Sequence, residues 1–330
     1  MDMARRWFFT GLPIAILSAP LAALAQQAGK IYRIGWLALG SPAPEVTRLH
    51  DRFRRGLQEY GYVDGRNYVI EFRWAHGHAE QLAELAADLA RMRVDVIVAV
   101  TSHGAHAAKR ATATIPILLI TPDPLSTGLV TNLSRPGGNV TGVTMFAGPE
   151  IVGKYVELIK AAVPALSRLG VLWSRPSPWQ QRMVHEAEAY GRTLRIHVQP
   201  AAFDGADDFD AAFAEMAPGG AESVLILPDG TTFAHRKRLA ALALRHRLPA
   251  LFTHLAAAAD GGLMAFATNV EDLFHRAASY VDRLKKGAKA GDLPIEQPTK
   301  FYLAINLKTA RALGLTIPPS LLLRADQVLE

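Results

Sequence analysis

Short polar side chains directly follow several apolar runs that are typical of buried strands. In the first half of the chain these are Ser41, the pair Thr101-Ser102, and Asp123. A hydroxyl beside the N–H groups that open a helix can hold a carboxylate, and an aspartate can pair with an ammonium group. The set therefore favours binding of a small molecule that carries both a carboxylate and an ammonium group. The alternative is that Ser41 and Thr101 only cap the helices that follow them.

The second half of the chain repeats this arrangement. Ser174 follows the apolar run 169–173, and Asp229 follows the run 223–227. Because parallel strands end at the same edge of a sheet, we expect each half to gather its polar residues at one edge, where open α/β sheets bind ligands. No group in either set forms a paired acid and base, so the pattern predicts a binding site without catalytic residues.

The elements that must position these residues alternate between strand-like and helix-like runs. Short connections in such a pattern predict a parallel, doubly wound sheet in each half, that is, two Rossmann-like α/β lobes. The expected strands span 32–39, 68–74, 94–100, 115–120 and 140–145 in the first half, and 169–173, 195–198, 223–227 and 250–253 in the second.

The last part of the chain holds more elements than two consecutive lobes need. A strand is expected at 263–267, followed by a helix at 270–286 that begins with a capping box of Thr268 and Glu271. A further strand-like run lies within 294–306. We expect these last elements to complete both lobes.

A polar stretch at 120–146 separates the two alternating halves. It contains Pro122-Asp123-Pro124 and a Gly/Asn-rich segment. Because proline fixes φ and lacks a backbone donor, Asp123 has little conformational freedom. The stretch is interpreted as the hinge between the lobes.

Composition narrows the class of protein. Half of the 330 residues are hydrophobic, which suits two ordinary domains. The net charge of +6 is spread along the chain without a basic, aromatic-interleaved stripe, so nucleic acid is not expected as a partner. The absence of cysteine excludes disulfides, thiolate metal sites, a Cys nucleophile and a lipid-modified N-terminal cysteine.

Residues 1–25 have the features of a cleaved export signal. Arg5-Arg6 precede an apolar run, and Ala23-Leu24-Ala25 offers small residues for cleavage before Gln26. The alternative is a membrane anchor, but prolines interrupt the run. The two arginines fit either the twin-arginine or the general secretory route. The expected location is the periplasm, as a soluble protein and not a lipoprotein.

Motifs for cofactors and metals are weak. Gly137-Gly138-Asn139 precedes a strand instead of following one, and no GxSxG is present, so neither a nucleotide cradle nor a serine hydrolase is predicted. The histidines of His76-Gly77-His78 and His103–His106 have no acidic neighbour, so neither a metal nor any other cofactor is expected.

With these features in place, the chain resembles the tryptophan/tyrosine-type substrate-binding proteins of ABC transporters, which have the type I periplasmic binding protein fold. The resemblance covers nearly the whole chain. Its most specific runs are RPGGNVTG (135–142) and LPIEQPTKFYLAINLKTARALGLTIPPSLLLRAD (293–326). The chain departs from the family pattern at Ser174, where Asn is commoner, and at Pro122, where Gly is commoner.

The resemblance implies that the chain crosses three times between its lobes. Lobe 1 would comprise 26–145 and 264–290, and lobe 2 would comprise 146–263 and 291–330. It implies a monomer that captures a small solute, often an aromatic amino acid or similar carboxylate, in the interlobe cleft for delivery to a membrane permease. The implied cleft residues are Ser41, Thr101, Ser102, Asp123, Thr144, Ser174, Asp229 and Asn269. A receptor-like sensor that presents the solute to a signalling partner remains an alternative, as does an exported transferase.

Overall fold

The first lobe is built on a five-stranded sheet in which every strand is parallel to its neighbours. In the computed structural model, which describes residues 31–330, the strand order is β2-β1-β3-β4-β5. Successive side chains of a strand point to opposite faces, so the apolar runs supply a core on each side. The strands are β1 Tyr32–Ala38, β2 Tyr68–Trp74, β3 Val96–Val100, β4 Ile117–Thr121 and β5 Val140–Thr144.

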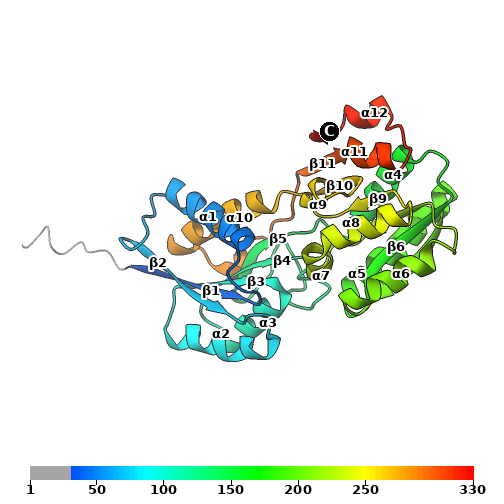
Figure 1. Ribbon diagram of the computed structural model, residues 1–330. Coiled ribbons are helices and arrows are strands. Elements are labelled where there is room, and N and C mark those ends of the chain that lie inside the picture. Colours follow the sequence, from blue (N-terminus) through cyan, green and yellow to red (C-terminus); the bar gives the residue numbers. More distant parts are fainter. Residues whose placement is uncertain (1–30) are drawn as a thin grey trace, which may run out of the picture.

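Helices cover both faces of this sheet, as Figure 1 shows. Trp36 of β1 packs with Phe53 of α1 and Phe274 of α10 on one face. Leu37 packs with Leu89 of α2 on the other. The helices are α1 Pro44–Glu59, α2 Leu82–Arg91, α3 Thr101–Ala111 and α10 Val270–Lys285. The doubly wound architecture expected from the alternating pattern is confirmed.

The second lobe contains a seven-stranded sheet of order β12-β11-β10-β9-β8-β6-β7. Its strands are β6 Arg168–Ser174, β7 His197–Phe203, β8 Ser223–Ile226, β9 Ala250–Phe252, β10 Met264–Thr268, β11 Phe301–Asn306 and β12 Gln327–Leu329. Helices α4 Ile151–Ala162 and α5 Pro178–Leu194 pack on one face. The other face carries α6 Phe209–Met216, α8 Arg236–Arg245 and α9 Ala256–Ala259. The short α7 Gly230–Ala234 follows β8, and α11 Leu307–Ala312 and α12 Pro319–Leu322 lie near the C-terminus.

Two strands of the second sheet, β11 and β12, run against the other five. β11 pairs antiparallel with β10, which the alternating sequence pattern does not predict. The reason is the path of the chain: β10 leaves the sheet at its carboxyl end for α10 in the first lobe. The returning chain enters at that same edge, so β11 must run in the opposite direction.

The chain crosses between the lobes three times. The first crossing lies between Met145, packed in the first lobe, and Phe146, buried in the core of the second. The second follows Thr268 at the end of β10. The third follows Glu296, whose backbone N–H donates to the Gly142 carbonyl at 3.0 Å and whose carbonyl accepts from the Thr144 N–H at 2.8 Å.

Two expected lobe boundaries are wrong by a few residues. The whole of β10, through Thr268, belongs to the second sheet, so the crossing expected before residue 264 comes after 268. Residues 291–296 still lie against the first lobe, where Ile295 is buried and Glu296 pairs with Val143 of β5. The boundary expected at 291 therefore falls after 296.

The stretch 120–146 is not the hinge as a whole. β4 and β5 both belong to the first sheet, and the loop between them packs on the first lobe through the buried Leu129 and Val130. Lys109 of α3 donates to the Leu129 carbonyl at 2.6 Å. Only the end of the stretch, at Met145–Phe146, crosses between the lobes.

Three local predictions also differ from the structure. α1 begins at Pro44 with Ala43 as its N-cap, so Ser41 is not a cap. The N-cap of α10 is Asn269, whose side chain accepts from Glu271 and Asp272, in place of the expected Thr268. β7 begins at His197, two residues late, because Arg195 ends α5 in a left-handed conformation (φ 57°).

No helix within residues 31–330 is long and apolar enough to cross a membrane. The predicted export signal, residues 1–25, lies outside the described residues.

Candidate functional site

The carboxyl edges of the two sheets meet at the crossings. The Thr268 hydroxyl, at the end of β10, donates to the carbonyl of Met145, the residue after β5, at 3.3 Å. The strand ends of both lobes are therefore on the sides of the lobes that the crossings connect (Figure 1). Carboxyl ends of strands are where open α/β sheets bind ligands, so residues from both lobes can act on one solute.

In the first lobe, the three expected hydroxyls occupy the ends of β1 and β3. The exposed Ser41 pairs its Oγ with Nδ1 of His76, at 3.0 Å. The Thr101 Oγ1 lies 3.4 Å from the Gly104 N–H that donates to it. The Ser102 Oγ lies 2.7 Å from Oγ1 of Thr121, the last residue of β4. Ser102 thus links two neighbouring strand ends.

Thr101 has an unusual backbone. Its φ of 74° lies in the left-handed region, which a β-branched residue rarely adopts. Such strain persists where the surrounding structure holds it, and it is frequent at ligand sites. α3 begins at this residue with Val100 as its N-cap, and the valine side chain offers no acceptor to the first-turn N–H groups.

Asp123 follows β4 in a tight turn. Its Oδ1 accepts from the N–H groups of Leu125 (3.0 Å) and Ser126 (3.2 Å). These bonds hold the carboxylate in place through one oxygen, and the half-buried side chain keeps its other oxygen for a further donor. The second oxygen can therefore accept from a ligand ammonium.

In the second lobe, Ser174 ends β6 and is buried, whereas Asp229 follows β8 and is half-buried. Asp229 is the N-cap of α7, and its Oδ1 accepts from the Thr231 N–H at 2.7 Å. As in Asp123, one carboxylate oxygen is engaged with backbone and orients the other. Each lobe thus places one aspartate beyond the carboxyl end of a central strand, β4 in the first sheet and β8 in the second.

The two residues expected at the crossings differ in what they offer a ligand. Thr144 ends β5 in the first lobe and is buried, with its hydroxyl donating to the Phe146 carbonyl at 2.7 Å. This bond gives Thr144 a structural role at the first crossing and leaves its hydroxyl proton engaged. Asn269 caps α10 and lines a pocket of about 330 Å³ between the second and third crossings.

Sequence reasoning missed a side chain that ties the second-lobe loops together. Gln180, in the first turn of α5, is fully buried; its Oε1 accepts from the Ser174 N–H at 2.6 Å, and its Nε2 donates to the Pro228 carbonyl at 2.9 Å. A signal was present: Gln180 precedes Met183, Val184 and Ala187 at helical spacing. It therefore shares their buried face.

Other polar groups on the same edges are buried and have no hydrogen-bond partner among the described residues: Ser126 Oγ, Ser177 Oγ and His254 Nε2. Buried polar groups are normally paired, so each calls for a partner from water or ligand. Burial also lowers the pKa of His254 to about 4, which keeps its imidazole neutral near pH 7.

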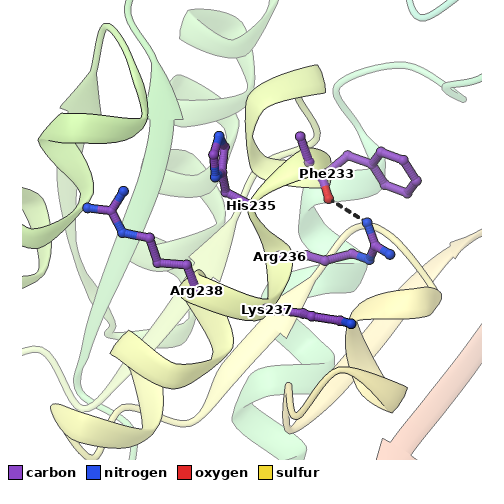
Figure 2. Close-up of a pocket in the computed structure, with 6 residues that line it drawn as sticks. Phe233, His235, Arg236, Lys237 and Arg238 are labelled. Atoms are coloured by element: carbon purple, nitrogen blue, oxygen red, sulfur yellow. Dashed lines mark hydrogen bonds between the residues drawn. The ribbon is translucent and has the colours of Figure 1, made fainter. Parts of the chain in front are cut away.

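A second pocket, of about 520 Å³, lies at the junction of α7 and α8 (Figure 2) and is lined by Phe233, Ala234, His235, Arg236, Lys237 and Arg238. Its cations are engaged: Arg236 Nε lies 2.6 Å from Asp260 Oδ2, and Arg238 lies 2.7 Å from Asp210. Arg236 also donates to the Phe233 carbonyl at 2.9 Å. An anion binding here would have to displace these carboxylates, so the strand ends are the better candidate site.

No group of three or more His, Asp or Glu side chains within residues 31–330 is placed to hold a metal ion. His76 bonds to Ser41, and His78 lies 3.2 Å from Glu80.

Comparisons with known proteins agree with this architecture. Residues 43–329 match the family described as ABC transporter substrate binding protein. A tyrosine-binding protein of Clostridioides difficile (strain R20291) is 24% identical over 274 residues, 82% of this chain and 78% of that protein.

Solved structures show the same fold. An ABC domain from Streptococcus pneumonia in complex with L-Trp is 27% identical, with a TM-score of 0.81. The alignment covers 91% of this chain and 100% of that domain's chain. A conserved domain protein from Vibrio cholerae is 24% identical, with a TM-score of 0.82 and the same coverage. The match of the family over nearly all of the described residues, with the two-lobed fold, establishes that this chain belongs to the ABC transporter substrate-binding proteins.

Proposed function

We propose that this protein captures a small solute that carries a carboxylate, such as an aromatic amino acid, between its lobes and delivers it to an ABC permease. The observation that carries the proposal is the pair of facing strand edges, each with one aspartate that keeps a carboxylate oxygen for a ligand. Two relatives support the ligand class: one is a tyrosine-binding protein and another was solved with L-Trp.

In this proposal the two charges of the ligand are recognised separately. Asp123 or Asp229 pairs with its ammonium group. Its carboxylate is held by Ser41, Thr101 and Ser102 with the first-turn N–H groups of α3; Ser174 and Asn269 complete the site. A micromolar solute needs about 8 kcal/mol, and several charge-assisted hydrogen bonds of about 1.5–3 kcal/mol with a buried ring supply it after ordering costs.

The rest of the cycle follows from the family. The protein would be exported by its N-terminal signal, act as a monomer in the periplasm, and present a closed, loaded form to the permease. Closure about the three crossings, with lobes bounded after 145, 268 and 296, would distinguish loaded from empty protein.

The test is calorimetric titration of the chain from Gln26 onward, with L-tryptophan, L-tyrosine, tryptamine and indole-3-propionate. Tryptamine lacks the carboxylate and indole-3-propionate lacks the ammonium. We expect the amino acids to bind and both analogues to lose about tenfold or more, as one lost charge-assisted bond implies.

Variants identify the contributing lobe. Of Asp123→Ala and Asp229→Ala, the variant that removes the partner of the ammonium should weaken amino acid binding but not indole-3-propionate binding. Asp64→Ala, at an exposed position in the first lobe, should leave both unchanged. Equal binding of tryptamine and tryptophan by the wild-type protein would contradict the carboxylate part of the proposal.

A further inference from the structure

Gln180 links two loops of the second lobe where the sheet itself no longer does. The ladder between β6 and β8 ends with the Leu227 N–H donating to the Leu172 carbonyl at 3.0 Å. Beyond this bond, the Gln180 amide connects the segments that follow β6 and β8 through its bonds to Ser174 and Pro228. One buried side chain therefore joins the end of β6 to the residue that precedes Asp229.

This link determines where the Asp229 carboxylate lies. Asp229 is bonded to the start of α7 by its side chain, and the Thr232 hydroxyl donates to the Leu227 carbonyl at 3.1 Å. The turn 227–232 is thus internally braced and moves as a unit. Besides the Leu227–Leu172 bond, the Gln180–Pro228 bond is what attaches this turn to the end of β6, so its loss loosens the part of the turn that carries Asp229.

The chemistry of the amide suits this task. Ser174 presents a donor and Pro228, which has no N–H of its own, presents an acceptor. A neutral amide satisfies both at once, which neither a carboxylate nor an aliphatic side chain can do. Gln180 is fully buried, so water does not readily replace it.

We propose that Gln180 is a positioning residue for the ligand site: it touches no ligand but fixes the Asp229 turn against Ser174. The proposal rests on the function proposed above. It adds that affinity depends on the amide in the core of the second lobe as well as on the polar residues at the strand ends.

Gln180→Glu provides a test that pH can reverse. The introduced side chain, as a carboxylate, offers no donor to the Pro228 carbonyl; when protonated, it donates there and still accepts from Ser174. Relative to wild-type protein at the same pH, we expect binding of L-tryptophan or L-tyrosine to be about tenfold weaker at pH 8 and to recover at pH 5. Gln180→Met, which cannot titrate, should stay weak at both pH values.

Asn306→Asp is the matched control. Asn306 is buried in the same lobe and makes the same two kinds of bond, donating to the Ala258 carbonyl at 2.8 Å and accepting from the Thr309 N–H at 3.0 Å. It ends the antiparallel β11, so it lies at the opposite edge of the sheet. This variant should lose stability at pH 8 but bind the amino acid as wild-type protein does.

A measurement without ligand separates the two proposals. Hydrogen exchange of the Leu227 amide, which donates to the Leu172 carbonyl across the two strand ends, should be followed by NMR; it should be faster in Gln180→Glu than in wild-type protein at pH 8 and match it at pH 5. If wild-type protein binds neither amino acid, the solute proposal fails while this exchange result still decides the role of Gln180 in fixing the turn. Unchanged exchange, unchanged affinity in Gln180→Glu at pH 8, or an equal loss of affinity in Asn306→Asp would overturn the inference.

Discussion

Acid should destabilise the first lobe through one buried histidine, His50 of α1. Its side chain is 7% exposed and packs with the rings of Trp36, Phe72 and Trp74 at centroid distances of 4.5, 5.0 and 5.3 Å. Its Nε2 is buried and has no hydrogen-bond partner among residues 31–330. Burial, and secondarily the charge of Arg54, lowers the pKa of His50 from 6.5 to about 4.

The sign and size of the change in unfolding free energy with pH follow from proton linkage. Below pH 6.5 the unfolded chain binds a proton at this histidine that the folded protein does not accept until about pH 4. Stability is therefore fully present above pH 6.5 and is lost as the pH falls through this window. At pH 5 the loss is about 1.5 pH units at 1.36 kcal/mol each, or about 2 kcal/mol.

Urea unfolding of wild-type protein and of His50→Leu at pH 7.5 and pH 5 measures how much His50 contributes to the loss of stability in acid. Leucine does not titrate, so the stability difference between the two proteins should shift by about 2 kcal/mol in favour of the variant on acidification. Part of the acid dependence should remain, because the pKa of His254 is also lowered to about 4. His78→Gln, at a side chain that is 60% exposed, is the control. Parallel pH profiles for wild-type protein and His50→Leu would refute the reasoning.

Three further substitutions test the packing and the strain. Gly56→Ala places a Cβ 2.4 Å from the His275 carbonyl oxygen on α10, so urea unfolding should show a loss of about 1–3 kcal/mol; no loss would argue against this α1–α10 contact. Thr101→Gly relieves the positive φ and should raise stability by about 1 kcal/mol while weakening amino acid binding; a destabilised variant that binds normally would contradict the strain assignment. Asp260→Asn leaves the largely buried guanidinium of Arg236 without its carboxylate and should cost about 3 kcal/mol in thermal unfolding, whereas an unchanged melting temperature would show the pair to be dispensable.

The strands of both lobes could be predicted because their apolar runs are continuous and bounded by turn residues. The crossings could not be placed to the residue. β10 reads as an ordinary strand, and only its pairing with β9 and β11 assigns it to the second sheet. The loop after β4 is polar and rich in Gly and Pro, as a hinge would be, yet Leu129 and Val130 anchor it to the first lobe.

In the candidate site, too, the features set by local sequence could be predicted and those set by the fold could not. The rule that ligands bind beyond strand carboxyl ends led to Asp123 and Asp229, because a strand end can be recognised locally. The bond of the Thr144 hydroxyl to a carbonyl two residues later could not be predicted, because it is set by the turn of the chain at the crossing. Gln180 was missed because its two partners lie 6 and 48 residues away, and only the fold brings them together.

The central claim is that solute binds between the lobes and closes them. The chain has no cysteine, so one can be introduced in each lobe without background, at the exposed Arg91 of α2 and Arg192 of α5, for a donor and acceptor dye pair. The measurement is the energy transfer between the dyes during titration with L-tryptophan or L-tyrosine. A rise in transfer that saturates with the calorimetric affinity, and is lost in the aspartate variant that loses calorimetric binding, is the predicted result. Calorimetric binding with no change in transfer would contradict interlobe capture.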